Sequence, residues 1–364
     1  MTISARRDRL RRRLAAAELD AMLVTDLVNV RYLSGFTGSN AALLVRADQD
    51  TPVLATDGRY VTQAAAQSPD AELVIERAVG PHLAGRAVAD GVRRLGFESH
   101  VVTVDGFGLL ERAGEGMEFV RAAGMVERLR EVKDAGEIAI LRLACEAADA
   151  ALHDLVARGG LRPGRTEKEV GRELESLMLD HGADGVSFET IVAAGANSAI
   201  PHHRPTDAVL ADGDFVKIDF GALVAGYHSD MTRTFVLGRA AQWQRDLYDL
   251  VATSQAAGRQ ALVAGANLRD VDGASRQVIA DAGFAENFGH GLGHGVGLQI
   301  HEAPGIGASA VGTLLAGAAV TVEPGVYLPG RGGVRIEDTL VVGSESAPTP
   351  ELLTRFPKEL AVIT

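Results

Sequence analysis

Cysteine, lysine and long apolar runs are scarce or absent in this chain of 364 residues. Cys145 is the one cysteine, so the chain cannot form an internal disulfide, and nothing in its cysteine usage indicates an oxidising compartment. No run of about 18 apolar residues occurs, which excludes a membrane-spanning helix. We therefore expect a cytoplasmic protein that has no membrane partner.

Positive charge is also in the minority, because 36 Lys and Arg residues face 48 Asp and Glu residues, for a formal net charge of −12. Nucleic acids and anionic membranes require a basic surface, so neither is expected as a partner. Six of the arginines fall within the first thirteen residues. Leu10 and Leu14 share a helical face there, while Asp8 and Glu18 interrupt the charge. A surface helix is therefore expected instead of a transit peptide.

The chain is long enough for about two domains of about 150 residues each. Up to about residue 128, short apolar runs alternate with helical patterns, which is typical of an α/β domain. Strands are expected at 21–24, 41–45, 53–55 and 73–75, and helices at 60–67 and 83–95.

A long amphipathic pattern marks the start of a different region. It predicts a helix over 133–157, and its apolar stripe places Cys145 in the core, where a cysteine acts as a small hydrophobic residue. Further helices are expected at 167–181 and 243–264, with glycine-punctuated strands between and after them. The sequence thus predicts a domain over 1–130 and a larger α+β domain over 131–364.

The larger region contains two predicted hairpins that each carry a pair of carboxylates. Residues 215–221 and 227–236 form strand patterns on either side of a turn through Ala225 and Gly226. The midpoint between Asp219 and Asp230 falls within that turn, so a regular hairpin would place these residues opposite each other, with Cβ atoms about 4.5–5.5 Å apart.

The second hairpin repeats this pattern, with strands expected at 320–325 and 334–338 around a turn at 329–333. The midpoint of Glu323 and Glu337 again falls in the turn. Four carboxylates on apolar strands cannot all stay charged and buried without compensation. Two divalent cations would balance them. Such ligands favour Mn²⁺, whereas a histidine ligand would shift the preference towards ions such as Zn²⁺ or Co²⁺.

Histidines occur in two places that could serve such a site. His290 and His294 lie in a glycine-rich segment over 288–298, and His301 follows in the run His301-Glu302-Ala303-Pro304. Glycines allow the backbone to approach a ligand closely. The pair at 202–203 would, by itself, indicate only an exposed polar turn.

These motifs, in this order, resemble those of the pita-bread metallopeptidases, the family of methionine aminopeptidase, aminopeptidase P, prolidase and creatinase. The segments that carry the resemblance are 216–221, 229–234, 290–304, 323–327 and 335–338. The resemblance implies that two metal ions are held by Asp219, Asp230, His294, Glu323 and Glu337, with Asp230 and Glu337 bridging both ions.

The same resemblance implies roles for further residues. His202 and His301 would act on the substrate together with Glu323, and Glu323 would carry a proton from a metal-activated water to the proline nitrogen. His290, Tyr327 and Arg335 are expected to bind substrate, with Arg335 also orienting Asp219.

The N-terminal region indicates which branch of the family is involved. Segments 34–40 and 56–60 are similar to parts of the creatinase-like N-terminal domain, which methionine aminopeptidases lack. The resemblance therefore implies a creatinase-like domain over 1–130, a pita-bread catalytic domain over 131–364, a homodimer, and small proline-containing peptides as substrates. Many family dipeptidases carry an arginine where this chain has Gly305, which favours an Xaa-Pro aminopeptidase (aminopeptidase P). An Xaa-Pro dipeptidase (prolidase) is the alternative, favoured by the shorter chain.

Two other interpretations stay open at this point. Some pita-bread proteins are non-catalytic binding scaffolds, and creatinase-like amidinohydrolases use the same fold without metal. Because the chain keeps all five ligand positions, both interpretations are disfavoured.

Overall fold

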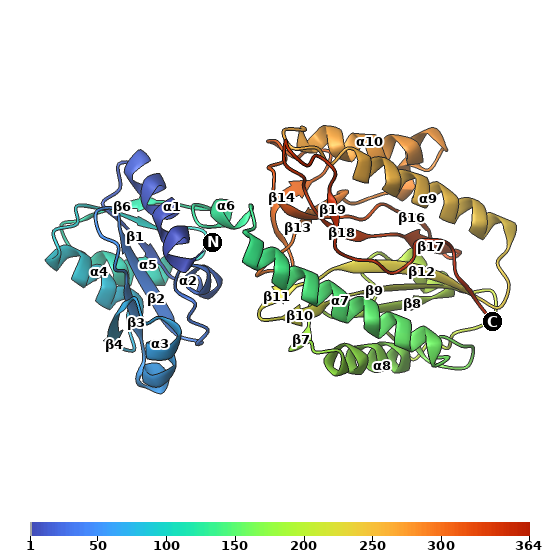
Figure 1. Cartoon of the computed structure of the whole chain (residues 1–364), viewed down its shortest axis with the longest axis horizontal. Helices are drawn as coiled ribbons and strands as arrows, with labels where there is room; N and C mark the ends of the chain where they lie inside the picture. The colour runs from blue at the N-terminus through green and yellow to red at the C-terminus, as the bar shows by residue number, and fades with distance from the viewer. Residues whose placement is uncertain (1) are drawn as a thin grey trace. The chain divides into compact units, whose positions relative to one another are not determined.

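A computed structural model describes residues 2–364 and divides the chain into two compact units, the first ending at Arg130 and the second beginning at Glu131 (Figure 1). No described helix is long and apolar enough to cross a bilayer. Each unit has its own hydrophobic core.

The first unit is built on a mixed six-stranded sheet with the order β4-β3-β2-β1-β5-β6. Its strands are β1 Ala21–Val24, β2 Ala41–Arg46, β3 Val53–Thr56, β4 Glu72–Ile75, β5 Arg94–Phe97 and β6 Glu118–Arg121. Its helices are α1 Ile3–Ala16, α2 Leu27–Ser34, α3 Val61–Gln67, α4 Val79–Ala89, α5 Val104–Ala113 and α6 Glu127–Arg130, with a 3₁₀ turn η1 at Gly58–Tyr60. The predicted α/β class is confirmed.

Two predicted helices of this unit have different outcomes. The arginine-rich start forms α1, with Leu10 and Leu14 buried beneath it, as expected. The helix predicted over 83–95 is wrong at its end, because α4 stops at Ala89. Gly91 then adopts a left-handed φ of 77°, which turns the chain so that the next apolar residues enter β5.

In the second unit, four long helices cover the two sides of the strands. They are α7 Ala135–Ala157, α8 Glu167–Asp180, α9 Gln242–Gln260 and α10 Leu268–Asp281. Figure 1 shows the strands between the pair α7 and α8 and the pair α9 and α10. Helix α7 begins two residues later than predicted, because Asp134 and Glu137 form a capping box. Cys145 is fully buried on it, as predicted.

The strands of this unit form four sheets. Three of them have the orders β20-β12-β9-β8, β14-β13-β15-β18-β19 and β11-β10-β7, and β16 pairs with β17. The bounds are β7 Gly185–Val186, β8 Ile191–Ala194, β9 Phe215–Phe220, β10 Ala222–Val224, β11 Tyr227–His228, β12 Met231–Leu237, β13 Gly293–Gly295, β14 Glu302–Ile306, β15 Ala319–Val322, β16 Gly325–Leu328, β17 Gly332–Arg335, β18 Asp338–Val341, β19 Glu351–Leu352 and β20 Val362–Ile363. Short 3₁₀ turns lie at η2 Gly195–Ala199 and η3 Ala285–Asn287.

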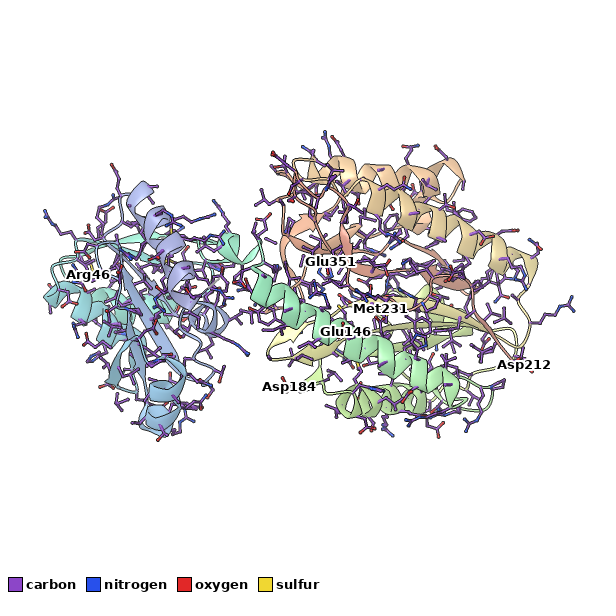
Figure 2. The ribbon with its side chains drawn as sticks, viewed as in Figure 1. Arg46, Glu146, Asp184, Asp212, Met231 and Glu351 are labelled. Carbon is purple, nitrogen blue, oxygen red and sulfur yellow. The ribbon has the colours of Figure 1, made fainter. Side chains whose placement is uncertain are left out.

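One core of this unit lies between α7, α8 and the sheet that contains β9 and β12. Met231 of β12 belongs to it, whereas Glu146 on the outer side of α7 is exposed (Figure 2). The other core lies between α9, α10 and the sheet that contains β15 and β18. The unit is therefore an α+β domain with strands between two helical layers, as predicted.

The first hairpin differs from prediction in its register. Asp219 pairs with Thr232, and Asp230 lies two residues before that partner, so the two aspartates are diagonal neighbours on one face and not directly opposite. The cause is the two-residue turn at Ala225 and Gly226, both with positive φ, which centres the hairpin between these two residues and gives Asp219 a partner two positions from the predicted one.

The second hairpin keeps the predicted register. The ladders β15/β18 and β16/β17 follow the same count, which places Glu323 and Glu337 opposite each other in the gap between them. In that gap, their backbone N–H groups donate to residues outside the hairpin. That of Glu323 donates to Leu292 O at 2.8 Å, and that of Glu337 donates to Thr232 O at 3.1 Å. The gap therefore ties this hairpin to both the first hairpin and the histidine segment.

Candidate metal centre

One cavity of about 290 Å³ in the second unit brings most of the predicted site residues together. Five acidic or imidazole side chains from five separate segments meet on its wall, beside two further histidines. These residues are His202, Asp219, Asp230, His294, His301, Glu323 and Glu337.

The glycines around His294 are required by close packing. A Cβ added to Gly293 would lie 2.1 Å from Thr321 O, and one added to Gly295 would lie 2.1 Å from Ala303 O. Only glycine allows β13 to approach its two neighbouring strands this closely. The glycine-rich pattern thus serves to seat His294 beside the carboxylates of the two hairpins.

The carboxylates of this cavity have too few cations beside them to balance their negative charge. Burial raises the pKa of Asp230 to about 6 and that of Glu323 to about 7. Burial, together with the nearby carboxylates of Asp230, Glu323 and Asp219, raises the pKa of Glu337 well above its usual range. In the absence of other cations, these groups hold protons that exposed carboxylic acids would lose.

His294 is the imidazole closest to this cluster. Its Nε2 lies 3.4 Å from Asp230 Oδ2 and 3.5 Å from Glu323 Oε1, while its Nδ1 lies 2.9 Å from Gly295 O. Burial disfavours the charged imidazole, but the two carboxylates outweigh this and raise the pKa of His294 to about 9. Even together with the Arg335 guanidinium, which contacts Asp219, one imidazolium does not balance four carboxylates.

The arrangement fits divalent cations. Ligand atoms of Asp230, His294 and Glu337 lie within 4.8 Å of one another. Asp219 Oδ1 is buried and has no hydrogen-bond partner among the described residues, although Arg335 contacts the other oxygen of this carboxylate. A buried carboxylate oxygen without a donor is costly unless a cation takes that place. Oxygen ligands with one imidazole suit divalent transition-metal ions.

Three predicted substrate-binding residues lie behind this cluster and do not line the cavity. Arg335 is buried, contacts Asp219, and donates from Nη1 to Tyr327 Oη at 2.9 Å and to Pro201 O at 3.1 Å. His290 Nε2 lies 2.9 Å from the same Tyr327 hydroxyl. Their contacts orient Asp219 and the segment before His202. This placement favours a positioning role over direct contact with substrate.

The segment that carries His202 is anchored by two residues to which no sequence motif assigned a role. The buried Lys217 donates to Ile200 O at 2.6 Å, and Glu167 Oε2 lies 2.8 Å from His203 Nε2. Glu167 also accepts hydrogen bonds from the backbone and side chain of Thr206. The adjacent histidines at 202–203 were the signal for this segment, whereas Glu167 looked like an ordinary acid in a first helical turn.

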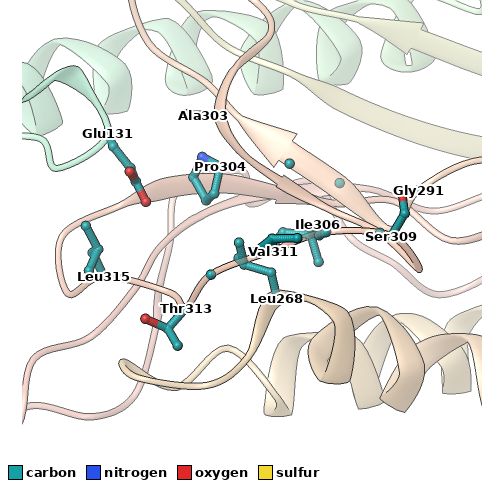
Figure 3. Close-up of a pocket in the computed structure, with 15 residues that line it drawn as sticks. Glu131, Leu268, Gly291, Ala303, Pro304, Ile306, Ser309, Val311, Thr313 and Leu315 are labelled. Carbon is teal, nitrogen blue, oxygen red and sulfur yellow. The ribbon is translucent and has the colours of Figure 1, made fainter. Parts of the chain in front are cut away.

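A second hollow, of about 630 Å³, lies along β14 and the following loop (Figure 3). Its wall consists mainly of glycines and apolar residues such as Leu268, Pro304 and Ile306, with Glu131 as the charged residue. Because it contains none of the predicted ligands, its greater size does not make it the reactive site.

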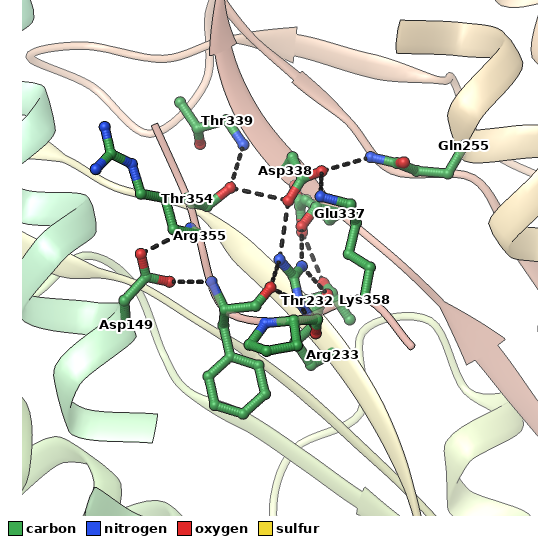
Figure 4. A network of polar contacts seen from close by, with 12 residues as sticks. Asp149, Thr232, Arg233, Gln255, Glu337, Asp338, Thr339, Thr354, Arg355 and Lys358 are labelled. Atoms are coloured by element: carbon green, nitrogen blue, oxygen red, sulfur yellow. Dashed lines mark hydrogen bonds and ion pairs between the residues drawn. The ribbon is translucent and has the colours of Figure 1, made fainter. Parts of the chain in front are cut away.

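Directly after Glu337, the next carboxylate has very different surroundings (Figure 4). Asp338 is fully buried, and its oxygens lie 2.9 Å from Arg233 Nη2 and 2.9 Å from Lys358 Nζ. Gln255 and Thr354 donate to it as well. Burial alone would raise the pKa of Asp338, but the two cations outweigh burial and lower it.

Comparison with known proteins gives matches over both units. Residues 139–344 match metallopeptidase family M24, and residues 6–132 match the Creatinase/Prolidase N-terminal domain. Among curated proteins, an Xaa-Pro dipeptidase of Pyrococcus horikoshii is 32% identical over 94% of this chain and 94% of its own length.

Solved structures show the same similarity. An Xaa-Pro dipeptidase from Bacillus anthracis is 38% identical, with a TM-score of 0.93 over 99% of this chain and 100% of that one. An X-Pro aminopeptidase from Thermotoga maritima is 33% identical, with a TM-score of 0.89 over 98% of this chain and 99% of that one. Similarity of this extent covers both units and the whole candidate site.

Proposed function

Because the chain belongs to metallopeptidase family M24, we propose that it is a dinuclear-metal exopeptidase that hydrolyses the peptide bond before proline in small peptides. The observation that carries the proposal is the single cavity in which four cation-deficient carboxylates meet His294. Relatives with both dipeptidase and aminopeptidase names support cleavage at Xaa-Pro bonds. The dipeptidase relatives give more weight to the prolidase alternative than Gly305 alone suggested.

Five residues would hold the metal ions. We assign Asp219 and Asp230 to one ion and His294 and Glu323 to the other, with Asp230 and Glu337 shared. Mn²⁺ is the ion we propose, with Zn²⁺ and Co²⁺ as alternatives to be tested. When bound, such ions lower the pKa of a water molecule and polarise the scissile carbonyl.

The other steps fall to side chains of the cavity wall. Glu323 reaches the cavity from the gap in the second hairpin and would accept the proton of the attacking water. It would then deliver that proton to the proline nitrogen, which leaves as a secondary amine. His202 and His301 line the same cavity and would donate hydrogen bonds to the carbonyl oxygen as negative charge develops on it.

The proposal also covers the domain assignment, the oligomeric state and the location of the protein. The match over 6–132 supports assigning residues 1–130 to a creatinase-like domain and 131–364 to the catalytic domain. We also propose a homodimer that acts in the cytoplasm. Sedimentation of the metal-loaded protein at two concentrations tests the dimer, and a monomer at both would contradict it.

Hydrolysis assays test the activity directly. The protein should be loaded separately with Mn²⁺, Zn²⁺ and Co²⁺ and given an Xaa-Pro dipeptide and an Xaa-Pro-Xaa tripeptide. Release of the first residue from either peptide supports the proposal, and cleavage of the dipeptide alone identifies a prolidase. If no Xaa-Pro bond is hydrolysed with any of the three ions, the proposed function is wrong.

A Glu323→Gln variant tests the proton transfer. We expect turnover to fall by about 10²–10⁴-fold, because general acid–base catalysis contributes on that scale. Metal content, measured by mass spectrometry, identifies variants whose loss comes from metal release. A metal-loaded variant with full turnover would show that Glu323 does not carry the proton.

A further inference from the structure

The catalytic cavity has a single permanently charged cation on its wall. Among the described residues that line it, Arg204 is the only arginine or lysine, and apart from the four carboxylates assigned to metal, Glu189 is the only acid. An arginine always carries its charge and offers five N–H donors in a planar fork that matches a carboxylate. The cavity thus contains one group suited to recognise a substrate carboxylate.

The backbone that carries Arg204 is held in place on both sides. Before it, Lys217 and Arg335 donate to the carbonyl groups of Ile200 and Pro201. The buried Glu167 binds His203 directly before it and Thr206 two residues after it. A side chain on such an anchored segment is aimed at the cavity by fixed backbone and not by a mobile loop.

Burial alternates along this segment in a way that pairs Arg204 with His202. His202 and Arg204 are exposed and line the cavity, while His203 between them is buried against Glu167. His202 and Arg204 therefore face the same side. A substrate whose scissile carbonyl meets His202 therefore has Arg204 on the same cavity wall.

Arg204 has donors to spare. Its Nε lies 3.1 Å from Glu189 Oε2, and both side chains are largely exposed, at 81% and 61%. Apart from Glu189, no described residue forms a hydrogen bond or ion pair with its two terminal nitrogens. An exposed ion pair of this kind is worth little by itself, so a bound carboxylate can share or replace Glu189 at small cost.

We propose that Arg204 binds the C-terminal carboxylate of an Xaa-Pro dipeptide and thereby makes this site select free dipeptides over peptides extended or blocked after proline. The inference rests on the proposed function and specifies its substrate class. It also accounts for a dipeptide preference without an arginine at Gly305, since the required cation comes from a different segment of the chain.

The test compares Ala-Pro, Ala-Pro-amide and Ala-Pro-Ala as substrates of the Mn²⁺-loaded protein. The wild type should prefer Ala-Pro. In Arg204→Gln, KM for Ala-Pro should rise by about tenfold, because charge-assisted hydrogen bonds contribute at least this much and solvent exposure keeps the effect near the lower limit. We expect kcat for Ala-Pro to stay within about twofold, and KM for the amide to stay unchanged. Arg204→Lys should restore part of the preference.

Two control variants separate recognition from structure. Glu189→Gln breaks the same ion pair but keeps the cation, so its KM for Ala-Pro should not rise. Arg158→Gln removes another exposed arginine, one that pairs with Asp154 at 2.8 Å and lies outside the cavity, and it controls for loss of surface charge.

Three outcomes would overturn the inference. They are that Arg204→Gln slows hydrolysis of Ala-Pro and of its amide equally, that Glu189→Gln reproduces the effect of Arg204→Gln, or that the wild type does not discriminate between the acid and the amide. In all three cases hydrolysis before proline still stands. If the wild type cleaves none of the three peptides with any metal, the proposed function fails and the inference fails with it.

Discussion

Glu337 and Asp338 are neighbours in the chain, and both carboxylates are buried, yet their surroundings are opposite in charge. Glu337 faces Asp219, Asp230 and Glu323, and its pKa is raised. Asp338 faces Arg233 and Lys358, and its pKa is lowered. Adjacent residues of an extended strand point to opposite sides, so one strand separates the two clusters.

The difference shows how buried carboxylates indicate a metal site. The Asp338 cluster supplies its own cations and its own hydrogen-bond donors, so it is complete as a structural network. The Glu337 cluster has one imidazole and the Arg335 guanidinium against four carboxylates, and Asp219 Oδ1 has no donor among the described residues. A charge deficit in a buried, accessible cavity therefore marks a place for external cations, whereas burial of acids alone does not.

The two clusters are also mechanically linked. Arg233, which pairs with Asp338, donates a hydrogen bond to Thr232 O at 2.9 Å and a further one to Glu337 O. Thr232 in turn donates from its hydroxyl to Glu337 Oε2 at 2.6 Å. Through Arg233 and Thr232, the Asp338 cluster thus holds the backbone and one carboxylate oxygen of Glu337.

The largest expected effect comes from Asp338→Asn. This substitution leaves the fully buried Arg233 without its counter-charge, so we expect the free energy of unfolding to fall by about 3–5 kcal/mol. The loss should be the same with chelator and with Mn²⁺, since Asp338 holds no metal. Urea denaturation under both conditions measures it. A loss confined to the metal-loaded protein would contradict the division into two clusters.

Glu337→Gln should show the opposite pattern. Activity is expected to fall by more than the roughly 100-fold that loss of an outer-shell partner costs, because a ligand is removed. The metal-free protein should be no less stable than the wild type, because the raised pKa of Glu337 already favours an uncharged group at this buried position, and Gln supplies one. Metal content and metal-free urea denaturation check these two statements. A large drop in metal-free stability would mean that Glu337 is mainly structural.

Between pH 8 and 5, protonation of the Glu337 cluster should change the free energy of unfolding. In the metal-free protein, the pKa values of Glu323, about 7, and Asp230, about 6, lie above the unfolded values of about 4.3 and 3.9, so folding takes up protons. His294, with a pKa of about 9, also binds protons more tightly when folded. All three groups therefore raise the free energy of unfolding as the pH falls through this window.

The metal-loaded protein should respond in the other direction. Protons compete with metal for these ligands, so the metal-induced stabilisation, about 2.7 kcal/mol at a free metal concentration of 100 Kd, should shrink on acidification. Asp338 contributes no slope here, because its lowered pKa lies below the window. Denaturation curves with chelator and with Mn²⁺ should converge from pH 8 to 5. Curves that stay parallel would contradict this assignment.

The smallest effect on stability is expected from Arg259→Gln, which compares a peripheral cation of the Asp338 cluster with a buried one. Arg259 Nη1 lies 3.7 Å from Asp338 Oδ2, and its side chain is 34% exposed. A peripheral cation of this kind contributes about 0–1 kcal/mol, well below the value for the buried Arg233. Thermal unfolding of Arg259→Gln and of a matched Arg233→Gln variant compares the two, and equal losses of stability would show that burial does not rank these partners.

Much of the candidate site followed from local sequence pattern. Alternating apolar residues located the strands that carry Asp219, Glu323 and Glu337, and the glycine-rich segment located His294. The register of the second hairpin was predictable, because both of its ladders share one count around the turn. In the first hairpin the predicted turn residues were right, but the predicted partner of Asp219 was two positions from the observed Thr232. The midpoint of the two aspartates lies one residue before the centre of the hairpin, which the positive φ values place between Ala225 and Gly226.

Other residues could not be found in this way, because their partners are distant in the chain. Glu167 meets His203 across 36 residues, and Arg233 meets Asp338 across 105 residues. Arg204 and Glu189 carried no motif and became visible only as parts of one cavity wall.

The sequence by itself determined the family resemblance, the two-part organisation that it predicts and the set of candidate ligands, because these depend on residue type, order and spacing along the chain. The tertiary structure decided which buried acid has cations beside it and which does not. That distinction depends on electrostatics between segments a hundred residues apart. It shows how the surroundings of Glu337 and Asp338 differ, whereas the sequence singled out Glu337 by spacing but did not show which cations lie beside Asp338.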